Sequence, residues 1–180
     1  MLTIEKTKEL LKSIGDGTVE LDENNCCEIG VPESDIVVNL RFVAEDGRLL
    51  LGTVIGELPD SSPVVLAHLL GELMKANFMW DLTLGNTLSL VDDSRIVLQN
   101  FYTESAETTF AEMLLNFCEN TEFMTAWYTD LKNETVEAFR ENKELIENDI
   151  DVDLTEDESE TVNGMISGAN IMTGNFALKA

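Results

Sequence analysis

The sequence predicts an α+β fold, an α/β sandwich in which a twisted, mostly antiparallel sheet packs against three main helices and a C-terminal tail follows. Two observations lead to this prediction. Segments with alternating apolar and polar side chains occur in pairs joined by turn residues, which is typical of β-hairpins. Three other segments carry apolar side chains at helical spacing. The expected order of elements is α-β-β-β-β-α-β-β-α.

The first element is a short helix that Thr3 caps and Gly15 ends. Its apolar face contains Ile4, Leu11 and Ile14, which are spaced for one side of a helix. Residues 18–31 then predict two short strands joined by the polar turn 22–25.

The next hairpin has the clearest local pattern. Ile36, Val38, Leu40 and Phe42 share one strand face, and Val37 and Val43 belong to the other. Asp46-Gly47 is a tight-turn dipeptide, and the return strand is expected over residues 49–55.

A helix is expected over residues 63–77, with Ser61 or Ser62 as its cap and Pro63 in its first turn. This helix is apolar nearly all round, which indicates packing between two layers. One layer is the chain's own sheet. The other is either a second subunit, whose backbone Gly71 would allow to come close, or more of the same subunit.

A second hairpin is expected from Thr87 to Tyr102, with its turn at Asp92-Asp93-Ser94. Ser105 is the expected cap of the longest helix, whose apolar stripe runs from Phe110 to Leu131 and predicts a core-facing side.

The composition changes near Asn133, so we expect a domain over residues 1–132 and a helical, then acidic and mobile, extension over 133–180. Residues 141–160 hold ten acids and one lysine, whereas the last twenty residues hold no acid. Asp149, Asp151, Asp153 and Glu160 match part of a calcium-loop template, but Leu154 stands where that loop has glycine. The alternatives are a solvated charge run and a weak divalent-ion site.

Charge and residue usage exclude several classes of function. With 11 Lys and Arg against 35 Asp and Glu, the net charge of −24 opposes binding to nucleic acids and to anionic membranes. No apolar run reaches the roughly 20 residues that span a bilayer, and the N-terminal residues lack the apolar block of a signal peptide, so we expect a cytosolic protein. With one histidine, three cysteines and no CxxC, we expect no enzyme, no cofactor and no metal.

Residues 69–131 resemble a known family, the class I type III secretion chaperones to which the Tir chaperone belongs. Leu69-Leu70-Gly71-Glu72-Leu73-Met74-Lys75-Ala76-Asn77 is similar to the leucine-rich helix of that family. Gly85 with Leu88-Ser89-Leu90 resembles its next strand, and Val97-Leu98, Phe117-Cys118 and Trp127 resemble the strand and helix that follow. The similarity covers about residues 1–132, and the extension is longer than this family usually has.

The resemblance implies a bacterial cytoplasmic homodimer that binds the N-terminal segment of a secreted effector in an extended form, with no cofactor. It places the leucine-rich helix and a neighbouring strand at the dimer interface, for which the candidates are Leu66, Leu70, Gly71, Met74 and Phe101. The candidates for effector binding are Ile4, Leu11, Ile14, Val37 and Val43, and each is equally compatible with an ordinary core position. The alternative function is a related α/β adaptor that binds a partner which is not exported.

Overall fold

The computed structural model describes residues 1–14, 17, 19–32, 34–104 and 108–152, except for the side chains of Met79 and residues 144–152. The chain divides into two units, Met1–Asn142 and Lys143–Ala180, and the fold described below is that of the first. The expected acidic run at 149–160 and the expected tail lie outside the side chains that are described. The boundary expected at residue 132 falls within a helix that continues past it, and the division at that residue stays a prediction.

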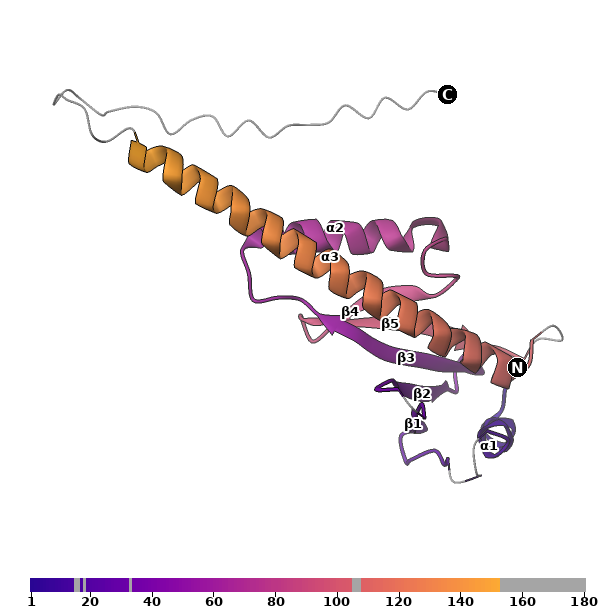
Figure 1. Cartoon of the computed structure of the whole chain (residues 1–180). Coiled ribbons are helices and arrows are strands. Elements are labelled where there is room, and N and C mark those ends of the chain that lie inside the picture. Colours follow the sequence, from indigo (N-terminus) through magenta and orange to yellow (C-terminus); the bar gives the residue numbers. More distant parts are fainter. Residues whose placement is uncertain (15–16, 18, 33, 105–107, 153–180) are drawn as a thin grey trace. The chain divides into compact units, whose positions relative to one another are not determined.

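Five strands form one antiparallel sheet in the order β1-β2-β3-β5-β4 (Figure 1). The strands are β1 Cys26–Gly30, β2 Val37–Val43, β3 Arg48–Glu57, β4 Thr87–Val91 and β5 Arg95–Tyr102. The main helices are α1 Ile4–Lys12, α2 Pro63–Asn77 and α3 Phe110–Val152, and a short 3-10 helix, η1 Phe78–Trp80, follows α2. The predicted class is therefore confirmed.

The expected pair of strands over residues 18–31 needs a correction. Only Cys26–Gly30 forms a strand, while residues 19–22 form none, and Thr18 lies outside the described residues. Asp22 explains the difference, because its carboxylate accepts hydrogen bonds from the N–H groups of Asn24 and Cys26 at 2.8 and 2.7 Å. This turn occupies backbone groups that would otherwise pair two strands.

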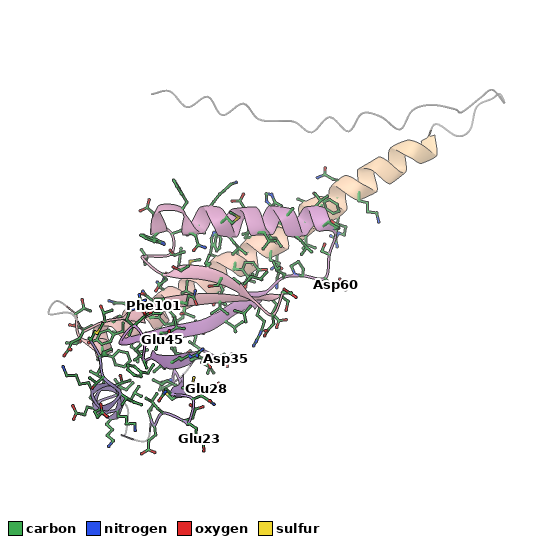
Figure 2. The ribbon with its side chains drawn as sticks, turned by 180° about the vertical axis from the view of Figure 1, so that it is seen from behind. Glu23, Glu28, Asp35, Glu45, Asp60 and Phe101 are labelled. Carbon is green, nitrogen blue, oxygen red and sulfur yellow. The ribbon has the colours of Figure 1, made fainter. Side chains whose placement is uncertain are left out.

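One face of the sheet is buried and the other is open. On β2, Val38, Leu40 and Phe42 are buried, whereas the residues between them are exposed. The buried face packs in one core with Leu11 of α1 and with α3 residues such as Phe117, Met124 and Tyr128. Figure 2 shows the sheet from the side opposite α3, with α3 behind the strands.

The helix starts follow from their capping residues. Thr3 caps α1 through its side chain, and Ser62 caps α2 with Pro63 at the first position, as predicted. For α3 the expected cap, Ser105, lies outside the described residues. Thr109 and Glu112 instead form a capping box, in which Thr109 N–H donates to Glu112 Oε2 and Glu112 N–H donates to Thr109 Oγ1. The Glu112 carboxylate accepts hydrogen bonds from Thr109 N–H and from Thr109 Oγ1–H, and these two bonds lower the pKa of the carboxyl.

The turns also agree with the sequence. Asp92 and Asp93 have φ angles of 51° and 61°, the left-handed conformation that a tight hairpin turn needs and that Asp tolerates. Gly47 has a φ of 57°, and its carbonyl accepts a 3.0 Å hydrogen bond from Leu2 N–H. The hairpin between β2 and β3 thus holds the N-terminus in place.

Close contact between α3 and the sheet depends on Gly56. A Cβ atom at this position would lie 2.5 Å from the Tyr128 ring. The Tyr128 hydroxyl donates a 3.0 Å hydrogen bond to Glu57 O, and burial raises the pKa of this tyrosine to about 12. Glycine therefore lets the long helix lie directly on β3 where the β3–β5 register shifts. Among the described helices, none is long and apolar enough to cross a bilayer.

Candidate functional site

The two edges of the sheet are treated differently by the rest of the chain. At the β4 edge, the Asn77 side chain at the end of α2 bonds to both backbone groups of Leu88. Asn77 Nδ2 donates to Leu88 O at 2.9 Å, and Leu88 N–H donates to Asn77 Oδ1 at 2.7 Å. This amide imitates the next strand, so the edge is closed at Leu88.

At the β1 edge the backbone is open over two residues. Cys26 directs its N–H and C=O away from β2, because both bond to Asp22 at 2.7 Å. In an antiparallel ladder alternate residues point the same way, so the backbone groups of Glu28 and Gly30 also point outward. Within the described part of the chain, no residue pairs with this side of Glu28 or Gly30. The β1 edge therefore presents a short template for another strand.

A mostly apolar groove of about 610 Å³ lies beside this open edge. Its floor and walls come from the end of α1, from β1 with the residues after it, and from the first turns of α3. On α3 the lining residues have the spacing of one helix face. The groove is lined by Ile14, Val19, Glu28, Ile29, Gly30, Val31, Pro32, Ala111, Leu114, Leu115 and Cys118.

The groove offers apolar surface and no nucleophile. Leu115, in the second turn of α3, is 59% exposed, so the groove presents apolar surface to the solvent. Burial is the main cause that raises the pKa of the Cys118 thiol, and the nearby carboxylates of Glu122 and Glu119 raise it further. This thiol therefore stays protonated and behaves as a small apolar group.

Helix α2 presents a second apolar surface. Its buried stripe consists of Val65, Leu69, Leu73 and Ala76. On its other sides Met74 is 73% exposed, and Leu66 and Leu70 are half-buried. A Cβ atom at Gly71 would meet nothing within 4 Å, so another chain could approach this side of α2 closely. The helix is thus apolar on more than one side, as its sequence predicted.

The predicted effector-binding residues do not form one surface. Ile14 lines the β1 groove, Leu11 is fully buried in the core, and Ile4 is partly buried against that core. Val37 and Val43 lie on the open face of the sheet, because they alternate with buried residues of β2. Their role in binding stays a prediction, and only Ile14 is placed beside the open edge.

The residues predicted for the dimer interface also lie on two separate surfaces. Leu66, Leu70, Gly71 and Met74 belong to α2, whereas Phe101 lies on the open face of β5 and is 42% exposed. The Arg48 guanidinium lies 4.6 Å from the centre of the Phe101 ring, a cation–π distance that holds this aromatic side chain in place. Dimerisation through these residues stays a prediction.

Several groove residues were missed by reasoning from the sequence. Ala111, Leu114, Leu115 and Cys118 form a second helical face beside the core stripe of α3, and that spacing could have indicated two apolar sides. Val31 and Pro32 carried no such signal, because their place beside α3 depends on the tertiary fold.

The chemistry of these surfaces is that of binding. Among the described residues, no group of three or more His, Cys, Asp or Glu side chains could hold a metal ion. The β1 surface combines apolar side chains with free backbone groups, which are the elements of peptide recognition by strand addition, whereas the α2 surface offers apolar side chains alone.

Comparisons with known proteins agree with this description. No curated protein sequence matches the chain. Among solved structures, the ExsC–ExsE complex matches with 21% identity and a TM-score of 0.57, covering 70% of this chain and 96% of that one. The HopA1–SchA chaperone–effector complex matches with 15% identity and a TM-score of 0.50, over 70% and 94% of the two chains. The ExoU–SpcU complex from the type III secretion system of Pseudomonas aeruginosa matches with 16% identity and a TM-score of 0.50, over 69% and 95%.

At these identities the structural matches show a shared fold. The family comparison goes further, because the model of the Tir chaperone protein (CesT) family matches residues 7–124, more than half of the chain. The matched residues include the open β1 edge, all of α2 and the first turns of α3. The chain therefore belongs to the Tir chaperone protein (CesT) family, a family of chaperones.

Proposed function

We propose that this protein is a cytosolic type III secretion chaperone that binds the N-terminal segment of a secreted effector in an extended form. Binding keeps that segment soluble and competent for secretion. The observation that carries the proposal is the open β1 edge with an apolar groove beside it, in a chain of the Tir chaperone family. The similarity in fold to a chaperone–effector complex, HopA1–SchA, supports it.

Two kinds of contact would hold the effector segment. Its backbone would bond to the outward N–H and C=O groups of Glu28 and Gly30, which adds a strand to the sheet. Every second side chain of that strand would then face α3 and enter the groove near Leu114 and Leu115. A fully buried leucine contributes about 1.5–3 kcal/mol, so a few apolar residues in the segment offset the cost of ordering it.

The active form in this proposal is a homodimer. The exposed Met74, the half-buried Leu66 and Leu70, and the open space at Gly71 make α2 the preferred contact between two copies. Phe101 would extend this interface onto the sheet. Bringing two copies together would also join two binding surfaces, so one effector segment could wrap around both.

Charge would favour particular effectors. The chain carries a net charge of −24, so the dimer attracts segments with basic flanks and repels acidic ones. The same charge keeps the complex in solution. We expect neither a cofactor nor a catalytic reaction.

Co-purification from the native cytosol, combined with light scattering, tests the proposal. We expect a dimer that holds the N-terminal region of an exported protein, which resists protease only in the complex. The variant Leu115→Glu should lose most of this partner, whereas Phe139→Glu, which places the same charge on α3 outside the groove, should keep it. A dimer that holds only partners that are not exported, or equal retention by the two variants, would contradict the proposal.

A further inference from the structure

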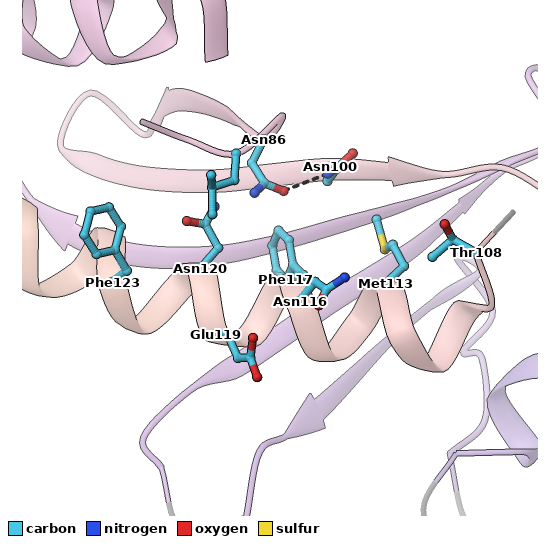
Figure 3. Close-up of a pocket in the computed structure, with 10 residues that line it drawn as sticks. Asn86, Asn100, Thr108, Met113, Asn116, Phe117, Glu119, Asn120 and Phe123 are labelled. Atoms are coloured by element: carbon cyan, nitrogen blue, oxygen red, sulfur yellow. Dashed lines mark hydrogen bonds between the residues drawn. The ribbon is translucent and has the colours of Figure 1, made fainter. Parts of the chain in front are cut away.

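A second hollow, of about 430 Å³, lies between α3 and the loop before β4 (Figure 3). It shares no lining residue with the β1 groove. Unlike that groove, it is lined by several asparagine side chains, among them Asn86 and Asn120, which are 4% and 3% exposed. Buried amides need hydrogen-bond partners, so their partners can be accounted for one atom at a time.

Almost every buried polar atom around the hollow is satisfied within the protein. Thr83 O accepts from Asn86 Nδ2 and from Asn120 Nδ2, both at 2.7 Å. Asn86 Oδ1 accepts from Asn100 Nδ2 at 2.7 Å, and Asn100 Oδ1 accepts from Phe101 N–H at 2.7 Å. The exception is Asn120 Oδ1, which is buried and has no partner among the described residues.

The orientation of the Asn120 amide is fixed by this network. Turning the amide over would place its oxygen against Thr83 O, and two acceptors cannot bond to each other. Asn120 Oδ1 therefore points away from Thr83, toward the side of Phe123 (Figure 3). Because this oxygen has almost no accessible surface, a donor bonds to it only after the side chains beside it move. An unpaired buried acceptor is costly, and what it lacks is a hydrogen-bond donor.

The size of the hollow and its other walls indicate which donor fits. One water occupies about 30 Å³, so the hollow has room for a side chain or a small molecule. Its lining residues include no Lys, Arg or His, and the Glu119 carboxylate stands at the exposed rim. The Phe123 ring is 50% exposed, and Phe117 also lines the hollow. A donor that is cationic, planar and able to stack on an aromatic ring matches all of these features.

We propose that this hollow is a binding site for an arginine side chain carried by a polypeptide partner. The guanidinium donates to Asn120 Oδ1, lies against Phe123 and faces the Glu119 carboxylate. Lysine fits less well, because an ammonium group cannot donate in one plane while stacking on a ring. A polypeptide is favoured over free arginine, because Leu84 and Phe123 offer exposed apolar surface at the rim and the carboxylate of the free amino acid would be repelled by Glu119.

Short peptides test this site without the effector. The full chain, labelled for NMR, is titrated with acetyl-Gly-Arg-Gly-amide and with the same peptide containing lysine or citrulline, the neutral isostere of arginine. We expect the arginine peptide to shift the Asn120 side-chain amide and the Phe123 signals, with an affinity at least fivefold higher than either other peptide. Equal affinities for arginine and citrulline, or no shift at these residues, would overturn the proposal.

Substitutions in the protein test whether the arginine peptide binds in the hollow or is only attracted by the negative charge of the whole chain. Glu119→Gln and Glu122→Gln remove the same charge from α3, but only Glu119 lines the hollow. We expect Glu119→Gln and Phe123→Ala each to weaken binding of the arginine peptide at least threefold, and Glu122→Gln to leave it unchanged. An equal effect of Glu119→Gln and Glu122→Gln would overturn the proposal. So would free L-arginine binding as tightly as the peptide, which would assign the hollow to the amino acid.

Discussion

The two edges of the sheet have the same backbone chemistry and opposite surroundings. At β4, the Asn77 amide bonds to the N–H and C=O of Leu88, as a neighbouring strand would. At β1, the outward groups of Glu28 and Gly30 have no partner in the described chain, and an apolar groove lies beside them.

This difference teaches how one sheet can avoid aggregation and still bind a peptide. An uncovered strand edge pairs with any extended chain, so proteins usually block it. Here one polar side chain blocks the β4 edge at Leu88, whereas the β1 edge lies beside a groove that favours apolar side chains. The open edge can form hydrogen bonds with a strand of any sequence, whereas the groove makes binding stronger for segments with apolar side chains.

The largest effect should come from opening the closed edge. Asn77→Ala removes both hydrogen bonds to Leu88, which is 7% exposed, and leaves a donor and an acceptor unpaired. We expect the free energy of unfolding to fall by about 3 kcal/mol, measured by urea denaturation. Asn133→Ala, at an exposed position of α3, should change it by less than about 0.5 kcal/mol. Equal stability of the two variants would show that Asn77 does not protect this edge.

A somewhat smaller effect is expected from changing the groove. Leu115→Glu should weaken binding of the co-purified partner about thirtyfold, or by about 2 kcal/mol, because an apolar contact is replaced by a charge. Leu115 is exposed, so the stability of the free protein should stay within about 0.5 kcal/mol of wild type. Calorimetric titration measures the first quantity and thermal unfolding the second. Unchanged affinity would remove the groove from the binding site.

The open edge itself can be blocked by one substitution. Gly30→Pro removes an outward N–H group without removing a hydrogen bond between β1 and β2, since Gly30 bonds away from β2. We expect about tenfold weaker partner binding, equal to about 1.4 kcal/mol, with little change in stability. Gly30→Ala is the control, because it keeps the N–H and its Cβ meets nothing within 4 Å. If both variants bind equally well, the partner does not add a strand at β1.

The last prediction concerns the reactivity of a thiol on β1 and does not involve partner binding. Burial, followed by the charges of Cys26 and Asp22, raises the pKa of Cys27 from 9.0 to about 11. At pH 8 its thiolate fraction is therefore about one hundredth that of an unperturbed thiol, and alkylation by iodoacetamide should be slow by a similar factor. The rate should rise about tenfold per pH unit until the pH nears 11. Tandem mass spectrometry of the wild-type protein, which separates modification of Cys27 from that of Cys26, measures this rate, and a rate that levels off near pH 9 would be contrary to the expected burial.

The sequence was most informative where a local residue decides the geometry. Ser62-Pro63 and Thr3 located the starts of two helices, and Asp92-Asp93 located a turn, because capping and left-handed φ angles are local properties. The expected strand before the turn at residues 22–25 was wrong for a local reason that was overlooked, namely the side-chain hydrogen bonds of Asp22.

The candidate site was only partly predictable, because it is assembled by tertiary contacts. The pairing of Asn77 with Leu88 joins two elements across a loop, and no periodicity in the sequence indicates it. The β1 groove joins Ile14, Val31 and Leu115, which are far apart along the chain. Of the five residues proposed for effector binding, the sequence could not separate Ile14, which lines the groove, from Leu11, which is buried in the core.

Hydrogen–deuterium exchange tests the central claim, that a partner adds a strand at β1, most directly. In the free protein, the backbone amides of Glu28 and Gly30 should exchange rapidly, and that of Leu88, bonded to Asn77, slowly. In the complex with the co-purified partner, the Glu28 and Gly30 amides should become protected while Leu88 stays unchanged. Rapid exchange of Glu28 and Gly30 in a fully formed complex, with new protection elsewhere, would contradict strand addition at this edge.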